Sequence, residues 1–508
     1  MAALRSPRTP AVPSLLQNWV SLVGIILATS SFFAVVCLIA LDFFRGFNNP
    51  YLGILTYIVV PAFLSAGLLL LLAGVLGERH RRRRPVPGVI PALPRIDLNV
   101  PRQRRAVVAV TSGAVVFLLT TALGSYRTYQ FTESVPFCGE TCHTVMHPEY
   151  TAYQESPHAR VACVQCHIGP GADWFVKSKL SGAYQVYATL ANAYPRPIPT
   201  PIANLRPARE TCEQCHWPQK FFGKIERDFP HYLPDRSNSP WLIRMLVKIG
   251  GADPRFGPVG GIHWHMAIAN TIEYIATDKE RQVIPWVRLT DAQGRVTVYQ
   301  STDTPLTPAQ VAAAQPRVLD CIDCHNRPTH IYQAPSDAVN LALYTGRMSR
   351  ALPDLKRQAV QALTQTYGTS AAAAQGIMVT LTTFYQPARS PAVAAVPPAL
   401  VGQAVAETQR IYAHNFFPAM RVTWRAYPDN LGHLNFPGCF RCHDGHHTSA
   451  SGQAITHDCQ ACHSIVRQGP EGTPETSLAG LPFKHPVDIS GLWQQTNCSD
   501  CHTGALVE

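Results

Sequence analysis

The sequence predicts three N-terminal transmembrane helices followed by a mostly α-helical and irregular domain with a small β-hairpin insertion. Two observations support this fold class. The first quarter of the 508-residue chain holds three long stretches without a charged residue, and the rest holds fourteen of the fifteen cysteines in repeated short motifs. Long apolar stretches indicate membrane spans. Clustered cysteines indicate a domain whose interior is not built from apolar side chains alone.

The uncharged stretches cover residues 19–41, 51–77 and 106–126. Each reaches the roughly 20 residues that a helix needs to cross the hydrocarbon core. Cytoplasmic loops carry an excess of arginine and lysine. The loop 78–105 contains nine arginines, whereas the loop 42–50 contains only Arg45. We therefore expect a multi-pass protein of the cytoplasmic (inner) membrane, with a cytoplasmic N-terminus and a periplasmic domain after residue 126.

The net charge of +11 comes mostly from the arginines of residues 1–105. Because these arginines belong to the predicted cytoplasmic side, the charge indicates membrane orientation rather than a basic recognition surface. We expect no nucleic-acid partner.

Seven cysteine pairs are each followed directly by a histidine, six with the spacing C-x-x-C-H and the first as C-G-E-T-C-H. In this pattern both thiols form thioether bonds to haem c, and the histidine ligates the iron. A structural zinc site would not place a histidine after every pair, and a redox pair would occur once or twice. The sequence therefore predicts seven covalently bound haem c groups. The attachment pairs are Cys138/Cys142, Cys163/Cys166, Cys212/Cys215, Cys321/Cys324, Cys439/Cys442, Cys459/Cys462 and Cys498/Cys501, and the proximal ligands are His143, His167, His216, His325, His443, His463 and His502.

A sixth ligand or an open position is needed at each iron. A single histidine is more often an ordinary polar group than a ligand, but seven irons leave few positions that are far from a haem. Met146 lies three residues after His143 and either ligates the first haem or packs as an ordinary apolar side chain. The predicted distal histidines are His158, His330, His433, His457, His485 and one of the pair His263 and His265, and their assignment to particular irons stays open.

The motifs divide the exterior part into a trihaem domain at 127–220, a linker region with β elements at 221–320, a single-haem and helical subdomain at 321–430, and a C-terminal trihaem domain at 431–508, after the membrane domain 1–126. Each trihaem segment is too short for an apolar core around every cofactor. We therefore expect a haem-packed multihaem cytochrome c domain, with little regular secondary structure in the trihaem parts.

Between the trihaem segments the pattern is more conventional. Residues 271–277 and 283–289 alternate like strands, and 295–300 returns after a turn at 291–294, which predicts the hairpin. Helical patterns cover three further segments, 354–366, 370–385 and 400–414. We expect both parts to act as scaffolding.

The sequences F-C-G-E-T-C-H-T-V-M-H-P (137–148), S-P-H-A-R-V-A-C-V-Q-C-H (156–167) and K-S-K-L-S-G-A-Y-Q-V-Y (177–187) follow the third predicted span. Together they resemble the NapC/NirT family of membrane-anchored multihaem quinol dehydrogenases, over roughly residues 106–216. With three predicted spans and seven predicted haems, the chain is most similar to the heptahaem inner-membrane cytochromes of metal-reducing bacteria. The resemblance implies Met146 as a ligand of the first haem and His158 as a ligand of another.

The same resemblance implies a quinol-linked lysine and acid on the helix after the second motif. Here Lys177 and Lys179 flank a serine, and Gln185 takes the place of the acid. The residues also predict an amphipathic helix from Asp173, either at the membrane interface or packed on haems. Lys177, Lys179, Asp173 and Glu155 are candidates for binding or deprotonating a quinol hydroxyl.

The predicted function is oxidation of menaquinol from the membrane pool at the outer membrane face, with electrons passed to a periplasmic cytochrome or reductase. Quinol would be the substrate of this quinol dehydrogenase. Two alternatives remain: a terminal reductase of a nitrogen or sulfur oxyanion, and an electron-transfer subunit of a larger respiratory complex.

Overall fold

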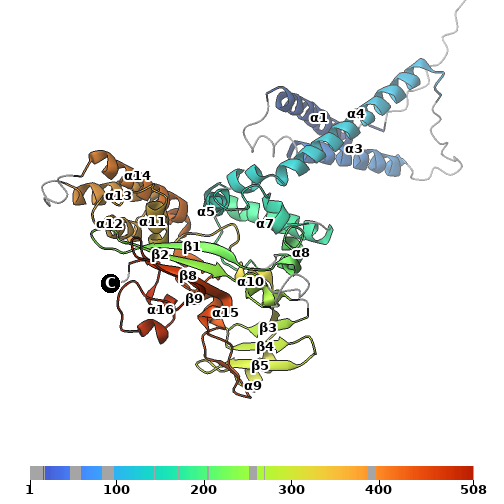
Figure 1. The fold of residues 1–508 in the computed structure, drawn as a ribbon. Coiled ribbons are helices and arrows are strands. Elements are labelled where there is room, and N and C mark those ends of the chain that lie inside the picture. Colours follow the sequence, from blue (N-terminus) through green and yellow to red (C-terminus); the bar gives the residue numbers. More distant parts are fainter. Residues whose placement is uncertain are drawn as a thin grey trace, which may run out of the picture. The chain divides into compact units, whose positions relative to one another are not determined.

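The computed structural model describes residues 15–16, 18–45, 59–82, 97–141, 143–169, 172–202, 205–250, 260–267, 269–386 and 396–506. The chain divides into two compact units, Met1–Thr141 and Cys142–Glu508. Figure 1 shows the elements of both units along the chain. The division of the exterior part into four domains stays a prediction.

Among its described residues the first unit contains three long helices, α1 (Trp19–Arg45), α3 (Val60–Arg82) and α4 (Pro101–Thr132), followed by a short π-helical turn, η2 (Phe137–Thr141). Small residues let α1 and α3 approach closely. A Cβ atom at Gly24 would lie 2.5 Å from the backbone nitrogen of Leu71. Such close backbone contact through small residues is typical of helix pairs in membranes.

Two of these helices contain stretches long and apolar enough to cross a membrane, Trp19–Ala40 and Val60–Arg81. The first predicted span is therefore confirmed as a candidate. The second predicted span is confirmed as a candidate over residues 60–77, and the apolar stretch continues to Arg81. Residues 51–58 of the prediction lie outside the described part. The third predicted stretch is helical, as part of α4, but it is not one of the two stretches found among the described residues, so its crossing stays a prediction.

The described part of the second unit contains two antiparallel sheets, drawn in Figure 1. The four-stranded sheet has the order β1 (Ile225–Tyr232), β2 (Pro240–Val247), β8 (His463–Pro470), β9 (Glu475–Leu481). The five-stranded sheet has the order β6 (Arg317–Val318), β3 (Thr271–Ile275), β4 (Trp286–Thr290), β5 (Val296–Ser301), β7 (His447–Ser449). Both sheets join the middle of the chain to its C-terminal segment.

The predicted hairpin is confirmed by the pairing of β4 with β5 around Asp291 and Gly294. The expectation of little regular structure in 431–508 is wrong, because β7, β8 and β9 lie there. Strand β8 begins at His463, the last residue of a haem motif. Because the strand begins within the motif, the sequence pattern did not indicate where it starts.

The apolar core lies mainly in four helices, α11 (Pro335–Tyr344), α12 (Leu355–Thr364), α13 (Ser370–Phe384) and α14 (Pro398–Asn415). The three predicted helices of this region are confirmed as α12, α13 and α14. The remaining helical segments are short or lie near the attachment motifs: α5 (His143–Gln154), α6 (Cys163–His167), α7 (Ala172–Leu190), α8 (Ala208–Cys212), α9 (Pro308–Ala313), α10 (Cys321–Cys324), α15 (Cys459–Cys462), α16 (Cys498–Cys501), η3 (Pro218–Lys220), η4 (Ile262–Met266), η5 (Pro418–Met420), η6 (Trp424–Ala426), η7 (Gly438–Arg441) and η8 (Leu492–Gln494).

Leu363 of α12 is fully buried. We expect Leu363→Ala to lower the free energy of unfolding by about 2–5 kcal/mol, because it leaves a cavity in the helical core. Chemical denaturation of the solubilised holoprotein, followed by far-ultraviolet circular dichroism, measures the change. Val379→Ala on the exposed side of α13 is the control and should change it by less than about 0.5 kcal/mol.

Candidate haem sites

Most of the regular attachment motifs lie on single short helical turns. The second motif lies wholly within α6 (Cys163–His167). In four others the backbone N–H of the histidine donates to the carbonyl of the first cysteine, as His325 N to Cys321 O at 2.8 Å and His502 N to Cys498 O at 2.8 Å. Polar side chains cap several of these turns. Asp458 Oδ1, for example, accepts a bond of 2.8 Å from Gln460 N before Cys462. One turn thus carries two thiols and an imidazole together.

The third motif differs from this pattern at its second cysteine. Helix α8 ends at Cys212, so Cys215 lies beyond the helix, in the turn that follows, and is exposed. Backbone bonds to Cys212 O, from Cys215 N at 3.1 Å and from His216 N at 2.8 Å, still hold the motif together. Burial and neighbouring thiols, Cys215 among them, raise the pKa of Cys166. Attachment of haem at Cys215 stays a prediction.

Six proximal histidines each face a second histidine ring. An imidazole nitrogen lies about 2 Å from a coordinated metal and its ring centre about 1 Å further, so two axial rings on one iron stand about 6 Å apart. The observed separations between ring centres match this value. They are 6.1 Å for His158 and His216, 6.3 Å for His330 and His167, 6.4 Å for His263 and His325, 5.7 Å for His265 and His443, 6.2 Å for His433 and His463, and 6.0 Å for His485 and His502.

Backbone carbonyl groups orient the rings of the histidines that face the proximal ligands. A ring N–H at Nδ1 that donates to a carbonyl leaves the lone pair of Nε2 free for a metal. Five of these histidines have Nδ1 within hydrogen-bond distance of a carbonyl oxygen. The distances are 2.6 Å for His263 to Ile249, 2.8 Å for His265 to Ile262, 3.0 Å for His330 to Glu149, 2.7 Å for His485 to Val487 and 3.4 Å for His158 to Pro328.

Burial keeps several of these imidazoles in the neutral form that binds metals. It lowers the pKa of His330 to about 3, with smaller effects from Arg327 and His167. It also lowers the pKa of His433 to about 4 and lowers the pKa of His265 and His443. The distance between the rings, the hydrogen bonds at Nδ1 and the neutral form of the imidazoles therefore all fit a haem iron between the two rings of a pair.

The six regular attachment motifs follow one another in space in the order of the sequence. Neighbouring motifs have thiols close enough to hydrogen-bond or to interact electrostatically. The linking pairs are Cys166 with Cys212, Cys212 with Cys321, Cys324 with Cys439, Cys439 with Cys462, and Cys459 with Cys498. The second to seventh sites thus form one continuous row.

The first site stays a prediction. Cys138 lies in η2, Cys142 lies outside the described residues, and His143 begins α5. Met146 lies one turn further along α5 and is partly buried.

The structure brings both histidines of the H-W-H segment to a proximal partner, where the sequence had indicated one. His265 faces the fifth site and His263 the fourth. The 3₁₀ turn η4 explains this, because residues two apart in it point in different directions. His457 is placed differently. Among the described ring contacts it lies against Phe440 at 4.9 Å, whereas His433 takes the position facing His463.

The quinol-site candidates lie on or near α7. Lys177 Nζ lies 4.7 Å from the centre of the Trp174 ring. Gln185 donates to Ser181 Oγ at 3.2 Å. Lys179 follows on the same helix, and Asp173 lies in its first turn, with a side chain outside the described part.

Helix α7 also has an exposed apolar face, formed by Leu180, Tyr184, Tyr187 and Leu190. Glu155 lies apart from this set. It accepts from Arg410 at 3.1 Å and lies 2.5 Å from His414 Nδ1, both on α14. Glu155, in the turn after α5, is therefore ion-paired with α14.

Repeated attachment turns, facing imidazoles and apolar N-terminal helices together define a membrane cytochrome of the c type. Residues 100–197 match the N-terminal region of the NapC/NirT cytochrome c family. The chain is also 45% identical over 490 residues to the cytochrome c-type protein ImcH of Geobacter sulfurreducens, with 96% of each chain covered. The chain belongs to the NapC/NirT cytochrome c family, which implies covalently bound haem c and a role in electron transfer. No solved structure matches it.

We expect His263→Ala and His265→Ala each to convert one low-spin haem to a high-spin haem, because each removes one axial imidazole. Electron paramagnetic resonance of the oxidised holoprotein measures this change. His446, which is exposed and pairs with Asp303, serves as the control, and His446→Ala should leave the spectrum unchanged. The spectrum of His457→Ala should also be unchanged, and a new high-spin signal there would contradict the observed pairing.

Proposed function

We propose that this protein is a heptahaem cytochrome of the cytoplasmic membrane that oxidises menaquinol at the outer face and delivers electrons to a periplasmic cytochrome or reductase. The row of six histidine pairs in chain order carries this proposal. The apolar helices α1 and α3 support the location. The arginine-rich loop supports the predicted cytoplasmic N-terminus.

The fourteen motif cysteines would attach the haems, and the histidine pairs would ligate six of the irons. Bound haem supplies one-electron exchange between its ferric and ferrous states. An iron held by two imidazoles offers no open position to a substrate. The facing histidines at six sites therefore favour electron transfer over oxyanion reduction.

The quinol would bind beside α7. The exposed apolar face of α7 is typical of an interfacial helix, which lies in the plane of the membrane surface. Lys177 and Lys179 would donate hydrogen bonds to the quinol oxygen, and Gln185 would orient it. Asp173 would accept a proton, because oxidation of a quinol releases two protons with its two electrons. The first attachment motif precedes α7 in the chain, with α5 and α6 between them.

We expect a menaquinol analogue to reduce the haems of the purified protein. The double variant Lys177→Met with Lys179→Met should slow this reduction by about 10²-fold or more, because the quinol oxygen loses its hydrogen-bond donors. Stopped-flow absorbance of the haem bands gives the rate. The control is Lys279→Met, at an exposed turn between β3 and β4. An unchanged rate in the double variant would remove both lysines from the site, and no reduction by any quinol would overturn the proposed activity.

We expect a pyridine haemochrome assay to give seven haems per chain. Replacing both Cys498 and Cys501 by alanine should reduce the count by one, because the thioether bonds of the last site are lost. A count well below seven in the unmodified protein would contradict the proposed function.

A further inference from the structure

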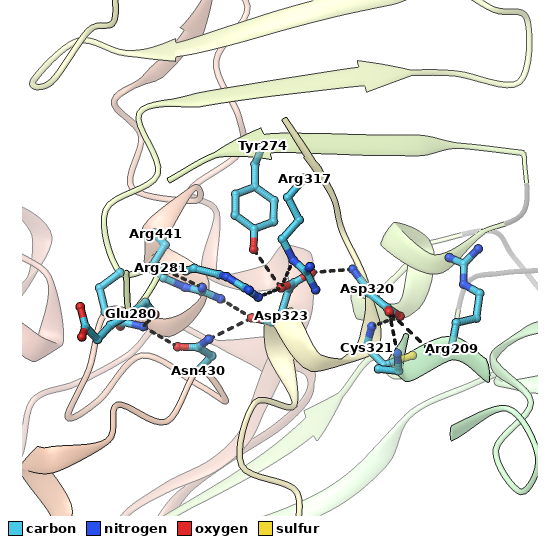
Figure 2. Close-up of polar contacts among 12 residues, drawn as sticks. Arg209, Tyr274, Glu280, Arg281, Arg317, Asp320, Cys321, Asp323, Asn430 and Arg441 are labelled. Carbon is cyan, nitrogen blue, oxygen red and sulfur yellow. Dashed lines mark hydrogen bonds and ion pairs between the residues drawn. The ribbon is translucent and has the colours of Figure 1, made fainter. Parts of the chain in front are cut away.

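One buried arginine connects two neighbouring attachment turns. Arg441 lies between the two cysteines of the fifth motif and is 9% exposed. Its guanidinium donates from Nε to Gly438 O at 2.8 Å, from Nη1 to Arg281 O at 2.9 Å, and from Nη2 to Asp323 O at 2.7 Å. Asp323 occupies a matching position between Cys321 and Cys324 of the fourth motif. Figure 2 shows Arg441 and Asp323 within this network.

Asp323, which accepts the bond from Arg441, is itself fixed by several contacts. The Asp323 side chain is 1% exposed. Its Oδ1 accepts from Tyr274 OH at 2.8 Å, Arg281 Nη1 at 3.0 Å and Arg317 Nε at 2.9 Å. Burial, together with the Asp323 carboxylate, raises the pKa of Tyr274, which keeps its hydroxyl a donor. The fourth turn is thus fixed to β3 and to the β3–β4 connection, and Arg441 extends this frame to the fifth turn.

The bonds of Arg441 end on carbonyl oxygens, which orient the guanidinium without cancelling its charge. Arg441 lies between Cys439 and Cys442 in the chain, and its Nη2 bond ends on the carbonyl of Asp323, the residue directly before Cys324. The charge therefore lies beside attachment cysteines of both sites.

A buried charge is weakly screened and acts over several ångströms. A fixed positive charge favours the reduced form of a nearby haem, because reduction removes one positive charge from the iron. Arg281 and Arg317 both pair with the buried Asp323 carboxylate, whereas the bonds of Arg441 described above end on neutral carbonyl groups.

We propose that Arg441 is a positioning residue that fixes the separation of the fourth and fifth haem sites and raises the reduction potentials of both. This inference rests on the proposed haem attachment at these motifs, and it does not depend on quinol oxidation. The position inside one C-x-x-C-H turn lets a single side chain act on two neighbouring sites.

The test compares Arg441→Gln and Arg441→Lys in the full-length holoprotein. A redox titration with chemical mediators, followed by haem absorbance, reports the potentials. Arg441→Gln removes the charge, so we expect two of the seven potentials to fall. Arg441→Lys keeps the charge and should keep those potentials close to the unmodified values. Equal shifts in both variants, or no shift in Arg441→Gln, would overturn the electrostatic part of the inference.

Positioning has its own readout. Neighbouring ferric haems show magnetic interaction in electron paramagnetic resonance that depends on their separation and orientation. Both variants lose the three-pronged contact to carbonyl groups, so we expect both to change this interaction. An unaltered interaction in both would overturn the positioning role.

The matched control is Arg357→Gln. Arg357 also donates to a backbone carbonyl, from Nε to Pro234 O at 2.9 Å, but it lies on α12 and is exposed. Its loss should change neither potentials nor magnetic interaction. If Arg441→Gln fails to incorporate haem, Arg281→Gln decides the matter, because Arg281 is part of the same network and Arg317 still pairs with Asp323. One lowered potential in Arg281→Gln supports the electrostatic effect, and unchanged potentials contradict it. Fewer than seven haems in the unmodified protein would instead indicate failure of the proposed function.

Discussion

The way distant segments of the second unit are held together depends on the distance between paired imidazole rings. Six pairs of rings stand 5.7–6.4 Å apart, and this spacing suits one metal between two rings. Several pairs join segments far apart in sequence, such as His265 with His443. A coordinated iron at each pair would therefore connect distant parts of the chain, in a region where short attachment turns leave little room for an apolar core.

A conventional framework surrounds these pairs. Helices α11 to α14 contain most of the fully buried apolar side chains, and the two sheets join the middle of the chain to its C-terminal segment. The ion pair between Glu155 and α14 links this helical core to the segment with the second motif. Strand β8 begins at His463, so the sheet itself orients one proximal ligand. The framework thus positions imidazoles that the attachment turns alone would leave loosely oriented.

Features that depend on local patterns could be predicted from the sequence. The C-x-x-C-H motifs, the three helices of the helical core and the β4–β5 hairpin each depend on residues close together in the chain. Features that depend on tertiary contacts could not. The partner of each proximal histidine, the β2–β8 pairing and the contact between Arg441 and Asp323 join segments separated by tens to hundreds of residues. His433 and His457 show the same limit, because both lie near attachment motifs in the sequence, and only the fold places His433 opposite His463.

The pairing of the histidines also has a consequence for biogenesis. During synthesis His158 and His216 are made close together in time, and His265 is already present when its partner His443 appears, whereas His167 must wait for His330. Thioether formation could proceed motif by motif, but complete coordination of the second iron would require a much later segment of the chain. Maturation would then finish in an order set by tertiary folding, with some partly ligated intermediates exposed to small molecules and oxidants in the meantime.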